Sequence, residues 1–213
     1  MDRSIQISTF SRITQVSRET IVSLNKYEKA LIKANTNVNL IGKSTISQIW
    51  TRHFLDSAQV FDLIDKNQKT VVDIGSGAGF PGLVISIIAK DRKSSLKIKL
   101  IEKSPKKIIF LKKIIKELKL NIEVYNENVN EKNFRFVDDF FIARAFKPLP
   151  IILELIHKKA KNFKKAIIFM GKTGHQELLR ASKSWDIKYK QTKSITSNDS
   201  TILEIKELKK KIE

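Results

Sequence analysis

The chain has 213 residues, of which 41 are Lys or Arg and 22 are Asp or Glu, so its formal net charge is +19. This length allows one sizeable core with an appendage and excludes two full domains. The absence of cysteine excludes disulfides and thiol chemistry. The longest apolar run, at 83–89, is far too short to cross a membrane, and residues 1–15 lack the apolar centre of a secretory signal. We therefore expect a cytoplasmic protein without a membrane partner.

The basic charge by itself gives RNA binding only weak support. An excess of positive charge favours an anionic partner, and nucleic acid is the first candidate. However, 33 of the basic residues are Lys, and the chain is also rich in Ile and Asn. This is the composition that an A/T-biased genome produces, with much of the charge spread over solvated faces. We expect both effects to contribute.

Residues 1–65 are predicted to form a helical extension that packs on a larger domain, residues 66–213. Apolar residues at helical spacing run over 5–31 on one helix or two, and a polar, Asn-rich break follows at 35–44. Helical spacing then resumes over 45–64.

From residue 70 onward the chain alternates strands and helices, which is typical of a mostly parallel sheet with helices on both faces. We predict a doubly wound α/β fold with seven strands. The tail at 206–213 is charged and either frays or ends the last strand. The expected strands lie at 70–74, 96–102, 121–125, 140–143, 166–170, 185–190 and 201–206, and the expected helices at 82–90, 105–118, 149–161 and 175–184.

The segment VVDIGSGAGFPG at 71–82 is the most informative part of the chain. A β-branched run suited to a buried strand leads into glycines that allow positive φ and leave space against the backbone. Pro81 fits the first turn of the following helix. Strand, glycine turn and helix N-terminus form the nucleotide-cofactor entrance of a doubly wound sheet. A purely structural turn is the alternative, which the flanking strand and helix disfavour. The candidate glycines are Gly75, Gly77 and Gly79.

Two acids distinguish between possible cofactors. Gly77-x-Gly79-x-x-Gly82 also matches the dinucleotide pattern, so the glycines alone do not exclude NAD or FAD. Asp73 lies just before the glycines, where a carboxylate would repel a pyrophosphate and favour an ammonium and a sulfonium. Glu102 ends the second expected strand, where it can accept hydrogen bonds from both ribose hydroxyls or be an ordinary strand-end carboxylate. S-adenosylmethionine is the expected cofactor.

Two further segments are expected to border the same crevice. Arg144 follows the fourth strand, and ligands of open α/β sheets sit at the carboxyl ends of strands. Its guanidinium could hold the cofactor carboxylate or an RNA phosphate, and a salt bridge at the sheet end is the alternative. Val129 and Asn130 lie in the loop that passes the adenine in such folds, where a backbone N–H and the Asn amide could read the purine edge.

Four motifs in order resemble the glucose-inhibited division protein B family over about residues 25–190: RHFLDSAQV, VDIGSGAGFPGLVISI, LIEKSPKKIIFLKK and ARAFKPL. Members of that family are S-adenosylmethionine-dependent methyltransferases of small-subunit ribosomal RNA. The resemblance implies a Rossmann-like methyltransferase domain at 66–213 that methylates N7 of one guanine in the 530-loop region of 16S RNA. The implied partner is this RNA or the 30S particle. A monomer is the default for a compact basic enzyme.

The resemblance also implies site residues. Cofactor contacts carry over to Gly75, Phe80, Val129, Asn130 and Arg144, although the family often has an acid where Asn130 stands. The sequence GKTG at 171–174 matches the family's usual Lys-Gly pattern only with an offset, and the assignment of Lys172 depends on that offset match. The cofactor-binding candidates are Asp73, Gly75, Gly77, Gly79, Phe80, Glu102, Val129, Asn130 and Arg144, and the RNA-binding candidates are Arg52, His53, Phe146, Lys147 and Lys172.

Two of the RNA-binding candidates have structural alternatives. His53, together with Arg52, is expected at the rim of the cleft in contact with an RNA phosphate or base. Alternatively, His53 and Asp56 face the same way on a helix and form a pair that fixes the extension to the sheet. Phe146 is suited to base stacking or to burial, and Lys147 borders the site.

The missing residue types favour chemistry without a general base. Cytosine C5 methylation needs a cysteine nucleophile, which the chain lacks. Enzymes that methylate exocyclic amines often carry Asn/Asp-Pro-Pro-aromatic after the fourth strand, where this chain has Arg144, Ala145 and Phe146. Guanine N7 has a free lone pair and can attack in line, so catalysis would rest on positioning. We predict no proton-transfer residue and no metal site, with Arg144 and His53 as positioning candidates.

Other functions remain open at this point. A methyltransferase of the same fold acting on a small molecule or a protein would have a neutral or acidic pocket rim. A non-catalytic RNA- or ribosome-binding protein would have an occluded glycine loop. A nicotinamide enzyme is disfavoured because we find no second nucleotide-binding half and no hydride-transfer site.

Overall fold

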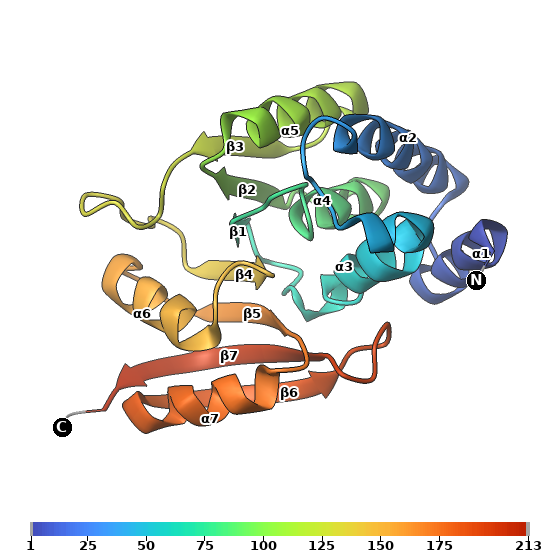
Figure 1. Ribbon diagram of the computed structural model, residues 1–213. Helices are drawn as coiled ribbons and strands as arrows, with labels where there is room; N and C mark the ends of the chain where they lie inside the picture. Colours follow the sequence, from blue (N-terminus) through green and yellow to red (C-terminus); the bar gives the residue numbers. More distant parts are fainter. Residues whose placement is uncertain (1, 212–213) are drawn as a thin grey trace.

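A seven-stranded sheet of order β3-β2-β1-β4-β5-β7-β6 forms the centre of the computed structural model, which describes residues 2–211 (Figure 1). Strands β1 to β5 are parallel, and β7 lies antiparallel to both of its neighbours. The predicted doubly wound, mostly parallel sheet is confirmed. The strand order reverses between β1 and β4, which places a crevice at their carboxyl ends. The strands are β1 (Thr70–Ile74), β2 (Lys97–Glu102), β3 (Ile122–Asn126), β4 (Phe140–Arg144), β5 (Lys165–Met170), β6 (Trp185–Lys193) and β7 (Thr201–Lys210).

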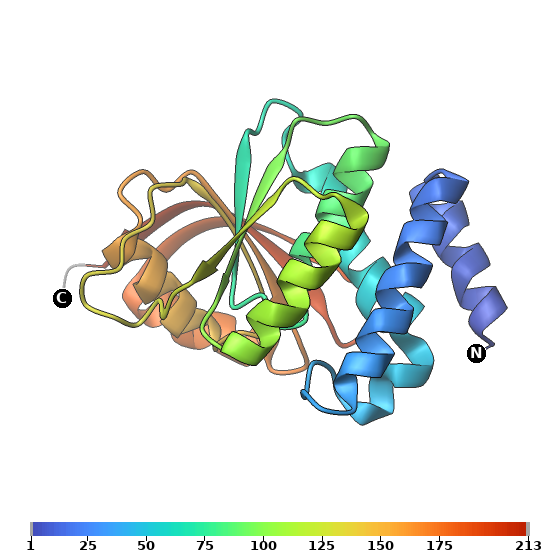
Figure 2. The same ribbon diagram turned by 90° about the horizontal axis from the view of Figure 1, so that it is seen from above.

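Helices cover both faces of the sheet (Figure 2). Helices α4 and α5 and the N-terminal helices share one buried apolar cluster with one face, and α6 and α7 share a second cluster with the other. Side chains of β1 alternate between them, with Val71 in the first cluster and Val72 in the second. Strand and helix periodicity after residue 70 therefore predicted the type and order of the elements correctly. These helices are α4 (Gly82–Asp91), α5 (Pro105–Leu118), α6 (Leu149–Lys159) and α7 (Gly174–Ser184).

The last two strands are longer than predicted. Strand β6 continues to Lys193 and β7 to Lys210, so most of the charged tail is strand; residues 212 and 213 lie outside the described residues. Antiparallel pairing accounts for this extension, because the register runs from Trp185 opposite Lys210 to Lys193 opposite Thr201. Lys188 on β6 also forms an ion pair with Glu207 on β7 at 3.0 Å. The charged residues of this tail within β7 therefore lie on exposed parts of a β-hairpin and not in a core.

Two helices, α1 (Arg3–Thr14) and α2 (Arg18–Asn35), form the first part of the N-terminal extension. Gln15 ends α1 in a left-handed conformation with φ 51°, and the Ser17 side chain caps α2. Helix α2 packs on α4 and α5. The extension and the sheet therefore share one core. The α2 side chains that reach it with no exposed surface are Leu24, Tyr27 and Leu31.

The segment at 45–64 is helical but not one regular helix. It consists of a 3-10 turn η1 (Lys43–Gln48), a π-helical turn η2 (Trp50–Leu55), a short α3 (Asp56–Ala58) and a 3-10 turn η3 (Phe61–Leu63). In η2 the N–H of Asp56 reaches back to the carbonyl oxygen of Thr51, which widens the turn. This local geometry brings His53 and Asp56 against Arg144 at the end of β4. Within residues 2–211 we find no helix whose length and hydropathy would suit a membrane span.

Candidate functional site

The glycine loop leaves β1 and folds back over the end of β2. The N–H groups of Gly75 and Ser76 both donate to the carbonyl oxygen of Ile101, at 2.9 and 3.1 Å. Gly75, Gly77 and Gly79 have φ of 73°, 58° and 101°, a region that side-chain-bearing residues rarely adopt. The backbone of this turn therefore requires glycine at all three positions.

The three glycines nevertheless face different surroundings. A Cβ on Gly75 would lie 2.2 Å from the Phe146 ring, and a Cβ on Gly79 would lie 2.3 Å from the Leu83 side chain. At Gly77 the nearest atom would be 3.9 Å away. Gly77 thus faces open space in a pocket, whereas Gly79 faces the apolar core.

This difference predicts separable effects of two substitutions. Gly77→Ala is expected to cost about 1–2 kcal/mol of stability, because its φ is left-handed, and to weaken cofactor binding by roughly tenfold through a methyl group in the pocket. Gly79→Ala is expected to add about 1–3 kcal/mol of overpacking against Leu83 and to affect cofactor affinity mainly through lost folded protein. Denaturant unfolding and calorimetry measure the two quantities. Equal cofactor affinities for both variants, corrected for the folded fraction, would contradict this assignment.

A cavity of about 500 Å³ lies at the carboxyl ends of β1, β2 and β4, with Gly77 on its wall. The segment Leu40, Ile41 and Gly42 borders it, because the Asn35 side chain accepts the N–H groups of Leu40 and Ile41 at 2.8 and 2.9 Å. Sequence reasoning missed this segment; the Asn-rich break with Gly42 was its only signal. The predicted cofactor residues on the wall are Gly75, Gly77, Phe80, Glu102, Val129, Asn130 and Arg144, and the predicted RNA residues are His53, Phe146 and Lys147.

Asp73 lies behind the glycine loop and, like Gly79, does not line this cavity in the described part of the chain. Its side chain accepts the N–H of Gly82 at 3.0 Å, at the start of α4, and is 1% exposed. Burial raises the pKa of Asp73 to about 7. Its other carboxylate oxygen has no hydrogen-bond partner among residues 2–211. The contacts of Asp73 are thus with the helix start, and its direct contact with the cofactor stays a prediction.

Glu102 faces the pocket and holds the loop at the same time. Its Oε2 accepts the N–H of Gly77 at 2.9 Å, and its Oε1 accepts the N–H groups of Lys103 and Ser104, each at 2.9 Å. A carboxylate has about four acceptor positions, so a ribose hydroxyl can still donate to Oε2. The structure therefore gives Glu102 a role in shaping the loop that the sequence did not indicate.

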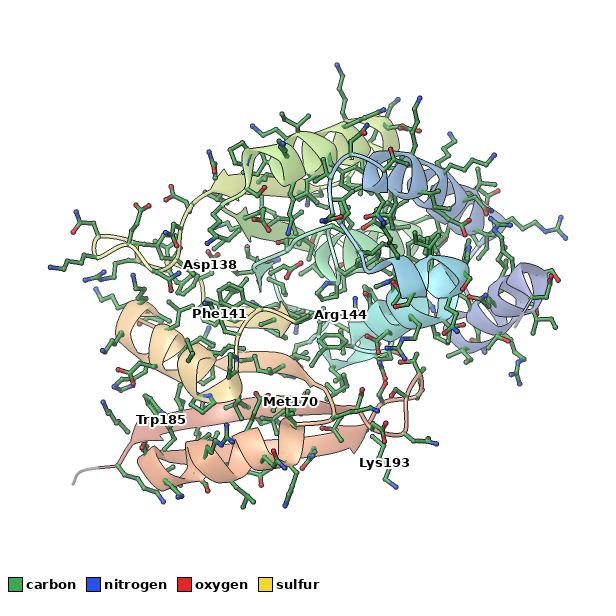
Figure 3. The ribbon with its side chains drawn as sticks, viewed as in Figure 1. Asp138, Phe141, Arg144, Met170, Trp185 and Lys193 are labelled. Carbon is green, nitrogen blue, oxygen red and sulfur yellow. The ribbon has the colours of Figure 1, made fainter. Side chains whose placement is uncertain are left out.

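Arg144 lies at the end of β4 (Figure 3) and binds Arg52 and His53 of the η2 turn and Asp56 at the start of α3. Its Nε lies 2.8 Å from Oδ2 of Asp56, and its Nη2 donates to the carbonyl oxygen of Arg52 at 2.7 Å. Nη1 lies 3.3 Å from Nδ1 of His53. The side chains of Arg144 and Asp56 are only 17% and 13% exposed. The π turn thus creates a socket for this guanidinium.

His53 is neutral and connects Arg144 to Thr45 by hydrogen bonds. Burial, followed by the positive charges of Arg144 and Arg52, lowers the pKa of His53 to about 3. A guanidinium only donates, so Nδ1 of His53 accepts from Arg144 and Nε2 carries the proton, 2.9 Å from the Thr45 hydroxyl. The ring stacks on Phe80 at 4.8 Å. His53 and Asp56 each bind Arg144, so a cluster of three residues takes the place of the His–Asp pair that was the structural alternative for His53.

The remaining RNA candidates lie outside the cofactor pocket. Arg52 is exposed and borders a neighbouring cavity with Arg144. Lys172 is 83% exposed, and its Nζ lies 3.4 Å from Asp199 on the β6–β7 loop.

The glycine loop is also held from behind by the extension. The buried Tyr27 donates from its hydroxyl to the carbonyl oxygen of Ala78 at 2.6 Å. Helical spacing marked Tyr27 as core but gave no signal of this loop contact.

Solved structures share this fold. A SAM dependent methyltransferase from Aquifex aeolicus has a TM-score of 0.54 and 18% identity, covering 84% of this chain and 97% of its own. M. jannaschii TYW2, solved in complex with AdoMet, has a TM-score of 0.52 and 16% identity, covering 76% and 78%. Both likenesses show a Rossmann-like fold, and the glycine-loop pocket lies at the edge of the sheet where such folds bind their ligands.

Sequence comparison identifies the family. The family model for rRNA small subunit methyltransferase G matches residues 20–206. Ribosomal RNA small subunit methyltransferase G of Pelagibacter ubique is 43% identical over 198 residues, which is 92% of this chain and 92% of that protein. The Rickettsia akari protein of the same name is 36% identical over 196 residues, covering 92% and 98%. The chain belongs to the rRNA small subunit methyltransferase G family, which confirms the resemblance found in the sequence.

Proposed function

We propose that the protein transfers a methyl group from S-adenosylmethionine to N7 of a guanine in the 530-loop region of small-subunit (16S) ribosomal RNA. The match to the methyltransferase G family over residues 20–206 carries this proposal. We also propose that the protein acts as a monomer in the cytoplasm, on this RNA or on the 30S particle.

The cavity suits the cofactor in size and in chemistry. Its volume of about 500 Å³ lies in the range of small-molecule sites. The backbone at Gly77 is open to a close ligand, and Glu102 retains an acceptor position for a ribose hydroxyl. Among residues 2–211, one N–H of Arg144 Nη1 has no acceptor and can meet the cofactor carboxylate or an RNA phosphate. Val129 and Asn130 line the same cavity and are the candidates for the adenine.

The cofactor supplies an activated methyl group on a sulfonium. With the cofactor held at Gly77 and Glu102, in-line attack by the N7 lone pair would exchange the carbon–sulfur bond for a carbon–nitrogen bond and would move the positive charge to the guanine ring. No proton moves in this step. His53 is neutral with both ring nitrogens engaged, and the Glu102 carboxylate accepts three N–H groups. The chain's residues therefore position and orient the two reactants.

A direct test is reverse-transcription mapping of N7-methylguanine in small-subunit RNA from cells with and without this gene. We expect one modified guanine, in the 530-loop region, that disappears with the gene and returns on complementation. Purified protein assayed on naked RNA and on 30S particles then distinguishes the two substrates. Unchanged methylation in the deletion strain would refute the proposal.

Catalysis without a general base predicts weak pH dependence. Glu127→Gln, which changes an exposed carboxylate on the pocket wall, is expected to change the single-turnover rate less than about threefold, because no proton is transferred. The wild-type rate at saturating substrates is expected to be nearly constant from about pH 6.5 to 8.5. A bell-shaped profile, or loss of turnover with both substrates still bound, would contradict this mechanism.

Two features of the pocket disfavour the alternative functions. Lys103, Lys107 and Lys147 line the pocket, opposed by the exposed Glu127 and the engaged Glu102, so the rim is basic. A basic rim suits a polyanion better than a neutral small molecule or a protein. The glycine loop is also open at Gly77, which disfavours a catalytically silent binding protein.

A further inference from the structure

A second cavity, of about 310 Å³, adjoins the cofactor pocket at the carboxyl ends of β4 and β5. Arg144 and Ala145 line both cavities. The far walls of the second cavity come from Gly171, after β5, and from the β6–β7 loop at 194–200. Figure 3 shows Arg144 and Met170 at the ends of the neighbouring strands β4 and β5 that border it.

Arg144 separates the two cavities. Its guanidinium carbon lies 5.7 Å from the centre of the Phe80 ring on the cofactor side and 5.9 Å from that of Phe169 on the other side. Ala145 adjoins both cavities with only a methyl side chain and has φ 49°, a strained conformation that is enriched at functional sites. Ligands in the two cavities can therefore approach each other over Ala145.

The second cavity combines apolar walls with hydroxyl groups. Phe169, Met170 and Ile202 supply apolar surface, and Ser197 and Ser200 are half-buried on the facing loop. Hydroxyls both donate and accept hydrogen bonds, which suits the pairing edge of guanine with its acceptor oxygen and donor nitrogens. Enzymes that modify a base within RNA commonly hold it outside its stack in a pocket of this kind.

The loop that closes this cavity is held in place. The N–H of Ile195 donates to the Gln59 side chain at 3.0 Å, and the Thr196 hydroxyl donates to Asp56 at 2.6 Å. Within the loop, the N–H of Ser194 donates to the carbonyl oxygen of Ser200 at 2.9 Å. Asp56 also binds Arg144, so one carboxylate positions both the β6–β7 loop and the guanidinium that separates the two cavities. The cavity is thus preformed without ligand.

We infer that this second cavity receives the target guanine, extruded from the RNA, with its N7 edge directed over Ala145 toward the methyl group. This inference deepens the proposed function and rests on it. It assigns a recognition role to the β6–β7 loop, which the sequence motifs did not indicate, and to Gly171, the first residue of the GKTG segment.

Blocking the cavity from two opposite walls tests the inference. A Cβ at Gly171 would meet no atom within 4 Å, and its φ lies outside the left-handed region, so the backbone accepts a side chain there and Gly171→Phe adds a ring at the wall of the cavity. Ser197→Phe blocks from the loop side, and Asn198→Phe places the same ring on the exposed outer side of that loop as a control. Both blocking variants are expected to lose methylation of small-subunit RNA at least ~100-fold with unchanged S-adenosylmethionine affinity, whereas Asn198→Phe keeps both.

A binding experiment separates this inference from the proposed function. With S-adenosylhomocysteine filling the cofactor pocket, ligand-observed NMR with guanosine is expected to show binding to the wild type and to Asn198→Phe, and loss of binding in both blocking variants. Ribose 5-phosphate is expected not to compete. Guanosine binding that is absent, equal in all variants, or displaced by ribose 5-phosphate overturns the inference, as does full methylation by the blocking variants. A wild type that binds guanosine in this way but leaves the RNA unmethylated refutes the proposed function alone.

Discussion

Arg144→Met is expected to reduce the methyl-transfer rate at least ~100-fold, because the guanidinium lines both the cofactor pocket and the second cavity and orients the ligands of both. It is also expected to destabilise the fold by about 3–5 kcal/mol, because Asp56 would remain as a buried carboxylate without its cation. The pair is mostly buried, with side chains 17% and 13% exposed. Single-turnover kinetics and urea unfolding measure the two effects.

A double-mutant cycle separates these two contributions. Asp56→Leu with Arg144→Met removes the unpaired charge and is expected to recover much of the stability, but not the rate. Lys147→Met, an exposed neighbour on the pocket wall, is the matched control and is expected to leave stability unchanged. Recovery of the rate together with stability in the double variant would show that Arg144 acts only as a structural residue.

Asp73 is expected to make the cofactor-free protein less stable as pH rises. Its pKa in the fold is about 7, against 3.8 in the unfolded chain, so between these values only the folded state holds the proton. The free energy of unfolding therefore falls by about 1.4 kcal/mol per pH unit through this window and levels off above pH 7, an integrated change of about 4 kcal/mol. The cause is burial of the carboxylate, and the hydrogen bond from the Gly82 N–H does not compensate for the lost hydration.

His53 acts in the opposite sense and must be separated from Asp73. The pKa of His53 is lowered to about 3, so the unfolded chain binds its proton first and stability rises with pH up to about 6.5. Because His53 is present in both the wild type and Asp73→Asn, its contribution drops out of the difference between their unfolding free energies. We expect that difference to fall from pH 5 to 7 and then to stay constant, as measured by urea titrations at each pH. Asp65→Asn, at an exposed carboxylate, serves as the control, and a flat Asp73 difference curve would contradict the assigned pKa.

The sequence predicted the sheet, its helices and the glycine turn, because their signals are local. Periodicity of two or 3.6 residues reports which side of a strand or helix is buried, and buried runs such as β1 and α4 leave few alternatives. The three glycines marked left-handed backbone directly, and their φ values match that expectation. The four motifs in order were sufficient to indicate the family to which the chain belongs.

Side-chain partners could not be derived in the same way, because they depend on elements far apart in the chain. The alternation of β1 directs Asp73 to the α4 side of the sheet, behind the loop that the sequence suggested it would serve. Arg144 was predicted at the crevice, but its socket requires the π turn of η2, whose widened geometry leaves no signature in residue spacing.

Periodicity along the chain thus determined the class of fold and the position of the cofactor loop. Packing across the chain determined which polar groups meet. The second cavity is the clearest case, because its walls come from Arg52 and Asp56 and from the segments 144–145, 169–171 and 194–202. Burial of the Arg144 charge needs partners from the extension, and the extension is oriented only when its apolar face joins the core of the sheet.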